Sequence, residues 1–241
     1  MKYITLFEGQ TAFDEAKSTL DRPNVSYVKE NGNVYSLAVA GGVTYEYVDI
    51  GLSVKWAKCN VGAEKETDAG LYFAWGETTG YTASQVGTDK QFSWSDYKYG
   101  NSSSNLTKYN QSDGKTVLES TDDAAAQIMG GDWRMPTQTE IQELLTNTKH
   151  EWVTNYNGTG VNGYKFTSNK EGYQNNSIFI PAAGYCSGGS VNSVGYNGYV
   201  WSSSLYASDP NYAWDLSFGS DNCYMYYNGR CYGQCVRGVR K

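Results

Sequence analysis

Residues 133–145 read Trp-Arg-Met-Pro-Thr-Gln-Thr-Glu-Ile-Gln-Glu-Leu-Leu, and they contain the clearest helix signal in the chain. Thr137 and Glu140 have the spacing of a capping box, in which each side chain accepts a hydrogen bond from the backbone N–H of the other residue. The apolar residues that follow recur on one helical face: Ile141, Leu144 and Leu145. This stretch therefore predicts an amphipathic helix near 137–148.

The rest of the larger part of the chain has the pattern of strands and turns, apart from one further helix. Residues 121–129 are rich in alanine, and Asp122 and Asp123 stand where they complement the helix dipole. With 27 Gly, 4 Pro and 22 Tyr, the composition is typical of short strands joined by long turns. Two helices in a strand-rich chain predict an α+β fold with short antiparallel sheets and long ordered loops.

Residues 1–41 are predicted to form a separate small unit. A helix is expected to begin near Thr11, and two strands, 24–28 and 34–39, are expected to form a hairpin around Asn31-Gly32. Forty residues rarely hold a hydrophobic core alone. We therefore expect this unit to anchor the protein or to form a homo-oligomer, and we expect a main domain at 45–241.

Charge and hydropathy exclude several classes of partner. The net charge is −6, and the chain has no stripe of Lys and Arg of the kind that binds nucleic acid. Membrane insertion is not expected, because no run approaches the roughly 20 apolar residues of a membrane span. The first residues lack the pattern of a secretory signal, so the chain is expected to stay soluble after synthesis in the cytosol.

The five cysteines are odd in number and include no C-x-x-C pair: Cys59, Cys186, Cys223, Cys231 and Cys235. This pattern argues against a disulfide framework and against a structural zinc site. We therefore expect mostly free thiols, and no metal or other cofactor.

Candidate catalytic groups have simpler structural explanations. His150 is the only histidine, and a surface position near the end of the predicted helix suits it better than a catalytic triad. Asp122 and Asp123 are better explained as residues of a helix start than as metal ligands or an acid–base pair. Glu77 and Arg134 are candidate members of a buried structural ion pair. No catalytic residue is predicted, although a hydrolytic or oxidative site in residues 72–77 stays an alternative.

Residues 196–235 combine many tyrosines with Ser, Gly and Asn, the composition of antibody-type paratopes. Apolar and polar residues alternate within 214–219, which predicts a strand with one face in the core. Asp215, Ser217 and Gly219 are expected to point outward. Tyrosine is also common in strands for reasons of packing alone, so composition leaves a purely structural role open.

Several blocks, in this order, closely resemble the major paralogous domain of Bacteroidales and Fibrobacter proteins. The blocks are Tyr47–Leu52 with Val54–Ala57 and Cys59–Gly62, Tyr72–Glu77, Trp133–Thr137 with Glu140 and Leu144-Leu145, Ile178–Gly184 with Trp201–Ser204, and Val236-Arg237. That domain belongs to the C-type-lectin-like class related to formylglycine-generating enzymes. The resemblance covers 45–241 and implies a C-type-lectin-like fold in which Trp133, Trp201 and Trp214 are largely buried. The N-terminal unit resembles leader segments of phage-encoded members.

Residues 196–235 also resemble the variable region of a target of a diversity-generating retroelement. In such systems a reverse transcriptase mutates adenines of a template, so Asn codons become codons for Tyr, Cys, Asp, Ser or Gly. Mutation of adenines in such Asn codons does not produce Glu or Lys codons. In agreement with this, the chain has no Glu after Glu171, and its only later Lys is Lys241. The resemblance implies framework roles for Trp214, Met225 and Gln234. It implies ligand-binding roles for the variable positions: Tyr196, Tyr206, Asp209, Tyr212, Asp215, Ser217, Gly219, Asp221, Cys223, Tyr224, Tyr226, Tyr227, Gly229, Cys231, Tyr232 and Cys235.

These resemblances imply a diversified variable protein that a bacteriophage carries on its virion for receptor binding and host attachment. The implied partner is a protein or glycan on a bacterial surface, such as that of Bacteroides in the gut microbiome. The bacterial cell surface and the cytoplasm are alternative locations, and an enzyme of related fold or a purely structural domain are alternative functions. Formylglycine-generating chemistry does not carry over, because Cys231 and Cys235 have different flanks. Calcium-dependent sugar binding is not expected, since Asp209-Pro-Asn211 and Trp214-Asp215 lie too close together to match the two separate lectin motifs.

Overall fold

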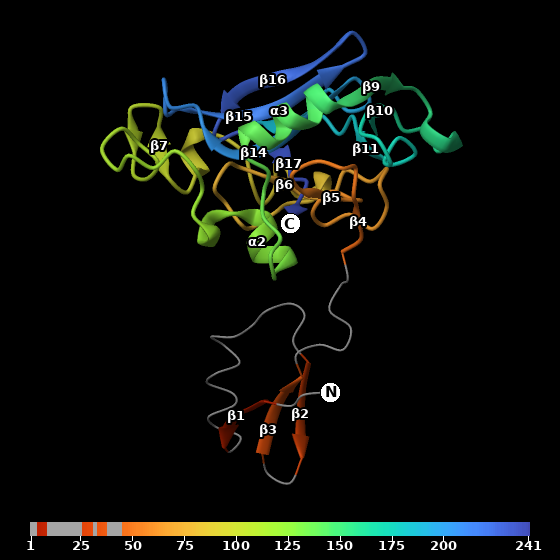
Figure 1. Ribbon diagram of the computed structural model, residues 1–241. Helices are drawn as coiled ribbons and strands as arrows, with labels where there is room; N and C mark the ends of the chain where they lie inside the picture. The colour runs from red at the N-terminus through yellow and green to blue at the C-terminus, as the bar shows by residue number, and fades with distance from the viewer. Residues whose placement is uncertain (1–3, 9–25, 31–32, 38–44) are drawn as a thin grey trace. The chain divides into compact units, whose positions relative to one another are not determined.

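The computed structural model describes residues 4–8, 26–30, 33–37 and 45–241 (Figure 1). The chain divides into two compact units, Met1–Thr44 and Tyr45–Lys241. In the first unit, three antiparallel strands pair in the order β1-β3-β2: β1 (Ile4–Glu8), β2 (Ser26–Glu30) and β3 (Asn33–Leu37). Strands β2 and β3 form the hairpin that the Asn-Gly pair predicts. Strand β1 was not predicted, and the helix expected near Thr11 lies outside the described residues.

The larger unit is a mixed α+β structure made mostly of short sheets. Its α-helices are α2 (Ala124–Met129) and α3 (Gln138–Asn147), and single 3-10 turns occur at Ala83–Gln85, Trp94–Asp96, Ser120–Asp122 and Tyr156–Gly158. Its strands are β4 (Tyr47–Val48), β5 (Lys55–Ala57), β6 (Tyr72–Phe73), β7 (Gly100–Ser102), β8 (Asn105–Leu106), β9 (Thr148–Val153), β10 (Gly163–Ser168), β11 (Ser177–Pro181), β12 (Tyr185–Ser187), β13 (Ser190–Asn192), β14 (Asn197–Leu205), β15 (Tyr212–Gly219), β16 (Asn222–Gly229), β17 (Gln234–Cys235) and β18 (Val239–Arg240). The prediction of an α+β fold with two helices is confirmed at this level.

The principal sheet has the strand order β16-β15-β14-β17-β6 (Figure 1). Strands β14, β15 and β16 form an antiparallel meander, and β17 joins β14 in parallel through Val200 and Cys235. Strand β16 is the edge of this sheet. One face of the meander packs against α3, whose Ile141 and Leu144 share a buried cluster with Leu216 and Phe218. The opposite face of the meander therefore carries the residues that alternate with these.

Helix α3 begins as the sequence predicts. Thr137 accepts a hydrogen bond from the Glu140 backbone N–H at 3.3 Å, and the Glu140 carboxylate accepts one from the Thr137 N–H at 2.8 Å. Helix α2 is shorter than predicted, because Asp123 is its N-cap and accepts from the Ala126 N–H at 2.9 Å. Asp122 precedes the helix in a 3-10 turn, where its carboxylate is held by other groups.

Three side-chain placements differ from expectation. His150 lies in β9, not at a helix end, because α3 stops at Asn147 and the chain continues directly as a strand. Glu77 pairs with Lys90 and Arg134 pairs with Glu140, so the two do not form a common ion pair. Trp214 is half-buried, because it lies among tyrosine rings toward one end of the sheet. Trp133 and Trp201 are buried, as expected.

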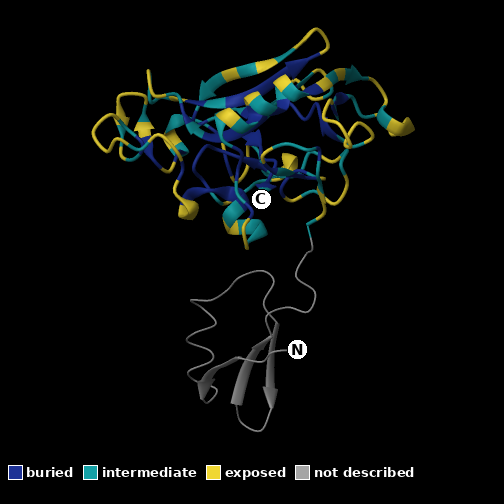
Figure 2. Ribbon diagram, in the orientation of Figure 1, coloured by how far each residue is buried: buried dark blue, intermediate teal, exposed yellow. Residues whose placement is uncertain are grey.

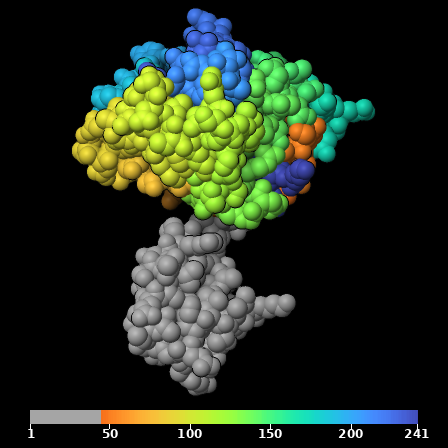
Figure 3. All heavy atoms as spheres, turned by 90° about the vertical axis from the view of Figure 1, so that its left-hand side faces the viewer, coloured from red at the N-terminus to blue at the C-terminus, as the bar shows by residue number. Residues whose placement is uncertain are grey.

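The long segment from 79 to 119 covers one side of the larger unit and appears in yellow to light green in the space-filling view (Figure 3). It contains the β7–β8 hairpin and two 3-10 turns, but otherwise follows an irregular path. Tyr97 and Tyr109 anchor it, since both are buried against Trp75 in the core of the unit. The composition predicts long ordered loops, and this segment is one of them.

Candidate functional site

The β14–β16 meander has two chemically different faces. On the face toward α3, Leu216 pairs with Met225 and Phe218 pairs with Cys223. On the opposite face, Asp215 stands beside Tyr226 and Ser217 stands beside Tyr224. Because successive side chains of a strand point to opposite sides, β16 turns its tyrosines at 224 and 226 away from the core. Figure 2 shows exposed residues recurring along this edge strand.

A cluster of aromatic rings extends along β16 and the adjoining loop, and we call it the tyrosine cluster: Tyr206, Tyr212, Trp214, Tyr224, Tyr226 and Tyr227. Tyr227 lies at its centre, stacked on Tyr206 at 4.1 Å and on Tyr226 at 5.0 Å between ring centroids. Tyr212 and Trp214 meet Tyr227 edge-on at 5.5 and 5.8 Å. By the same alternation, Tyr212, Trp214 and Tyr227 lie on the α3 side of the sheet and Tyr224 and Tyr226 on the opposite side, so the cluster extends around the edge strand.

The predicted variable positions differ widely in exposure. The exposed ones are Tyr196, Tyr212, Asp221, Tyr224 and Tyr226, and the half-buried ones are Tyr206, Asp209, Cys223, Tyr227, Gly229 and Tyr232. The expectation that Asp215, Ser217 and Gly219 point outward is wrong, since all three are buried, and the variable positions Cys231 and Cys235 are buried as well. The structure thus brings one part of the predicted set together at a surface and places the other part in the interior.

The buried positions have clear physical reasons. Strand β15 has hydrogen-bonded neighbours on both sides, and its polar face lies under side chains from β14 and β16. Asp215 and Ser217 are therefore covered although they are polar. Cys231 and Cys235 belong to the buried cluster around Trp75 and Trp201. All five cysteines lie in the described part of the chain, and none of them forms a disulfide.

A small hollow opens on the polar face of the meander, and we call it the tyrosine pocket. Its volume is about 120 Å³, and its walls are formed by Asn197, Tyr199, Ser217, Phe218, Asn222, Tyr224, Tyr226 and Asn228. The sequence analysis missed Tyr199 and the three asparagines as candidate residues. The strand alternation in β14 identifies Tyr199, because it lies between the buried Gly198 and Val200.

Asp215 is completely buried and does not itself line the pocket, but its carboxylate contacts two lining residues, Ser217 and Asn228. Its carboxylate accepts hydrogen bonds from Ser217 Oγ at 2.8 Å, Asn228 Nδ2 at 2.6 Å and Gln234 Nε2 at 2.7 Å. Burial raises the pKa of Asp215 to about 6, because the charged form is desolvated and the three hydrogen bonds offset only part of that cost. Gln234, predicted to be framework, therefore has a definite task, which is to hold this carboxylate.

Arg230 fixes the end of the β16 segment to the long loop. It is fully buried, and its guanidinium donates to the Tyr97 hydroxyl and to the backbone carbonyls of Lys108, Tyr109 and Pro210, at 2.9 to 3.0 Å. The guanidinium also lies 4.9 Å from the Trp75 ring centroid. This contact set ties residues 210–230 to the loop that contains Tyr97 and Tyr109.

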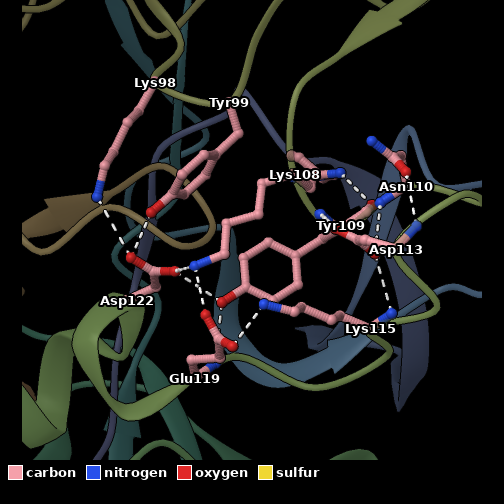
Figure 4. A network of polar contacts seen from close by, with 10 residues as sticks. Lys98, Tyr99, Lys108, Tyr109, Asn110, Asp113, Lys115, Glu119 and Asp122 are labelled. Carbon is pink, nitrogen blue, oxygen red and sulfur yellow. Dashed lines mark hydrogen bonds and ion pairs between the residues drawn. The ribbon is translucent and has the colours of Figure 1, made fainter.

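A second polar network lies inside the long loop (Figure 4). Asp122 accepts from the Tyr99 hydroxyl, from the Tyr109 hydroxyl at 2.7 Å, from Lys98 at 3.3 Å and from Lys108 at 2.5 Å. These donors lower the pKa of Asp122 to about 2 against the opposing effect of burial. The network holds the loop to the start of α2. It also explains Asp122 without a metal or an acid–base role.

Residues 72–77, the alternative enzyme region, are engaged in scaffold contacts. The Glu77 carboxylate accepts from Lys90 Nζ and from the Lys98 N–H, and its ion pair with Lys90 is almost completely buried. The Tyr72 hydroxyl donates to the Ala183 carbonyl at 2.7 Å, and burial raises the pKa of Tyr72 well above its usual value. A polar hollow of about 240 Å³ beside Glu77 is lined by both members of this ion pair.

Two further findings concern metals and membranes. Among the residues that the structure describes, no three or more His, Cys, Asp or Glu side chains gather in a way that could hold a metal ion. In the same residues, no helix has the length and apolar character needed to cross a membrane.

Comparison with known protein families gives a match to part of the chain. The model of a family described as a domain of unknown function, DUF8237, matches residues 149–239. The matched part begins in β9 and includes the complete β14–β16 meander with the tyrosine pocket. No curated protein and no solved structure matches the chain.

Proposed function

We propose that this chain is a non-enzymatic binding protein whose ligand surface is the tyrosine cluster together with the tyrosine pocket. One observation carries the proposal: Tyr212, Tyr224 and Tyr226 have 36 to 44% of their surface exposed, and the ring of Tyr227 at the sheet edge joins Tyr212 to Tyr226. A contiguous exposed aromatic surface is costly for a protein that binds nothing. Tyrosine provides a large contact area at a small cost in side-chain entropy, as in antibody paratopes.

We further propose that the larger unit is a C-type-lectin-like domain with a diversified surface, as the resemblance to retroelement targets implies. Support comes from the different places of the proposed framework residues and the proposed variable residues in the sheet. The proposed framework residues Met225 and Gln234 contact the core or a buried group, whereas Tyr224 and Tyr226 face away from it. In this proposal two buried members of the predicted set, Cys231 and Cys235, act in the fold and do not contact the ligand.

The setting that fits this surface is attachment of a phage virion to a bacterial host. The first unit, Met1–Thr44, would then anchor the protein or form a homo-oligomer. An imperfect repeat of the 3′ coding end beside a reverse transcriptase gene, differing only at adenines, would support diversification. A genome without such a repeat would contradict it.

The binding function is tested by replacing Tyr212, Tyr224 and Tyr226 together with Ser. Aromatic residues at the centre of an interface commonly contribute about 2 kcal/mol or more each. We expect the triple variant to lose attachment to intact Bacteroidales cells, measured by flow cytometry with the labelled full-length chain over a panel of strains. Its melting temperature should change little, because exposed residues contribute little to stability.

The matched control is Tyr47→Ser combined with Tyr173→Ser, because these tyrosines are exposed to a similar degree but lie outside the tyrosine cluster. The control should bind every strain that the parent binds. Undiminished attachment by the triple variant would contradict the proposed site. A strongly lowered melting temperature would show that the cluster serves the fold.

A further inference from the structure

Asp215 is a buried carboxylate that lacks a cationic partner within residues 45–241. Its three hydrogen-bond donors, from Ser217, Asn228 and Gln234, are all neutral. A buried charge normally has a partner of opposite sign, because desolvation of an ion is expensive. The negative charge of Asp215 is therefore not balanced by a cationic side chain of residues 45–241.

The side chains that donate to Asp215 have only hydrogen-bond acceptors left for a ligand. Ser217 has one O–H, and that hydrogen is donated to Asp215, which leaves only oxygen lone pairs for a ligand. Asn228 directs its amide nitrogen to Asp215, so its amide oxygen is the acceptor that stays available. Gln234 is held in the same way, and its buried Oε1 has no hydrogen-bond partner. This environment has an excess of acceptors and suits a ligand that is rich in donors.

The size of the pocket and the side chains that line it limit further which chemical groups can bind there. The pocket has a volume of about 120 Å³. Pockets that enclose a whole small-molecule ligand are larger, at roughly 300–1,000 Å³. The pocket therefore fits the end of one side chain from a larger partner. The rings of Tyr199, Tyr224 and Tyr226 line it, and aromatic faces attract cations.

The charge of the residues around the pocket is negative, which suits a cationic ligand. Residues 196–235 contain three aspartates, at 209, 215 and 221, and a single cationic residue, Arg230. Arg230 is fully buried and donates to backbone carbonyls, so it does not face a ligand. With a net charge of −6 for the whole chain, the long-range field attracts a positively charged partner.

We propose that the tyrosine pocket receives a cationic side chain, the ammonium of Lys or the guanidinium of Arg, presented by a protein on the surface that this chain binds. The inference rests on the proposed binding function and specifies the chemistry of the partner. Asp215 supplies the charge, Ser217 and Asn228 supply the acceptors, and the three tyrosines supply the aromatic walls.

The test is an NMR titration of the isotopically labelled full-length chain with three small probes. Two are cationic, Nα-acetyl-lysine methylamide and Nα-acetyl-arginine methylamide, and the third is the neutral analogue Nα-acetyl-norleucine methylamide. We expect the preferred cationic probe to bind on the order of tenfold more tightly than the neutral one. The shifted signals should include those of Ser217, Tyr224 and Asn228. Equal affinities, or shifts confined to other residues, would overturn the proposal, and the ratio of the two cationic probes assigns Lys or Arg.

Two variants test whether the Asp215 charge and the Tyr226 ring contribute to binding of the cationic probe. Asp215→Asn should lower the affinity for the cationic probe about tenfold, whereas Glu171→Gln should leave it unchanged. Glu171 is exposed in the loop between β10 and β11, so this control removes the same charge elsewhere. If Asp215→Asn is not folded, Tyr226→Leu replaces it, because it keeps apolar bulk and removes the aromatic face. That variant should bind the cationic probe roughly threefold to fivefold more weakly.

The result separates this inference from the binding function. Absence of cation preference, together with loss of cell attachment by the Tyr212, Tyr224 and Tyr226 variant, refutes the cationic partner and leaves the binding surface in place. Cation binding in the pocket with undiminished attachment by that variant supports the pocket chemistry and refutes the tyrosine cluster as the attachment site.

Discussion

Two buried aspartates in the larger unit have opposite environments. Asp122 is 4% exposed and accepts from two lysines and two tyrosine hydroxyls (Figure 4). Asp215 is 0% exposed and accepts from one hydroxyl and two amides. The pKa of Asp122 is lowered to about 2, and the pKa of Asp215 is raised to about 6. The same side chain is thus favoured as an ion at one site and disfavoured as an ion at the other.

The difference distinguishes a structural clamp from a site that can receive a ligand. Around Asp122 the protein supplies all the opposite charge, so the network is complete and holds the long loop against α2. Around Asp215, residues 45–241 supply neutral donors only, and we propose that the balancing cation comes from a ligand in the tyrosine pocket. Burial alone does not separate the two cases, since both side chains are withdrawn from water. The identity of the partners separates them.

The largest expected effect comes from breaking the clamp. Asp122→Ala removes the acceptor shared by Lys98, Lys108, Tyr99 and Tyr109 and leaves the tyrosine hydroxyls buried without that partner. We expect the free energy of unfolding to fall by about 3–4 kcal/mol, measured by urea denaturation at pH 7. A loss below about 1 kcal/mol would show that the network does not hold the loop.

A smaller effect concerns the pH dependence of stability at Asp215. A folded-state pKa near 6, against an ordinary value of 3.8, means that folding favours the protonated carboxyl. Its contribution to stability is therefore greatest below pH 4 and falls by about 3 kcal/mol as the pH rises through 6. We expect the unfolding free energy of the parent, minus that of Asp215→Asn, to decrease by about 2.4 kcal/mol between pH 4 and pH 7, because the unfolded carboxyl is already partly ionised at pH 4.

Asp122 provides the opposite control for that experiment. Its folded-state pKa near 2 means that its stabilising contribution is present above pH 4 and is lost as the pH falls toward 2. The corresponding difference for Asp122→Asn should therefore stay level between pH 4 and pH 7. A level difference for Asp215→Asn as well would mean that Asp215 has no raised pKa, and the contrast between the two sites would disappear.

The smallest effect is expected at the rim of the clamp. The Lys98 side chain is 48% exposed, and its ammonium lies 3.3 Å from Asp122, so water screens the pair. Lys98→Met should lower the unfolding free energy by less than about 1 kcal/mol, because Lys108 and the two tyrosines stay in contact with the carboxylate. Thermal unfolding of Lys98→Met and of Asp122→Ala, measured under the same conditions, gives the ratio of the two losses of stability. Equal losses would show that Lys98 is the essential partner.

Local patterns in the sequence were sufficient where the interaction itself is local. The capping box of Thr137 and Glu140 predicted the start of α3, and the Asn-Gly pair predicted the β2–β3 hairpin, because the residues concerned are near neighbours in the chain. Apolar alternation in 214–219 correctly placed Leu216 and Phe218 in the core. The same alternation identified the opposite face of β15 but did not determine whether that face meets water.

That last question was decided only by the tertiary structure. Asp215 is buried because strands β14 and β16 flank it. Its contacts with Asn228 in β16 and Gln234 in β17 join residues that are 13 and 19 positions apart in the sequence. Tyr199 becomes part of the pocket for the same reason, since the strand pairing that sets it beside Ser217 is not encoded near it in the sequence. By itself, the sequence determined the two helices, the strand-rich character and the tyrosine-rich segment, because these depend on composition and on short spacings. Only the packing of three strands decided which of those tyrosines surround a buried charge, because burial and electrostatic environment depend on what the rest of the chain places nearby.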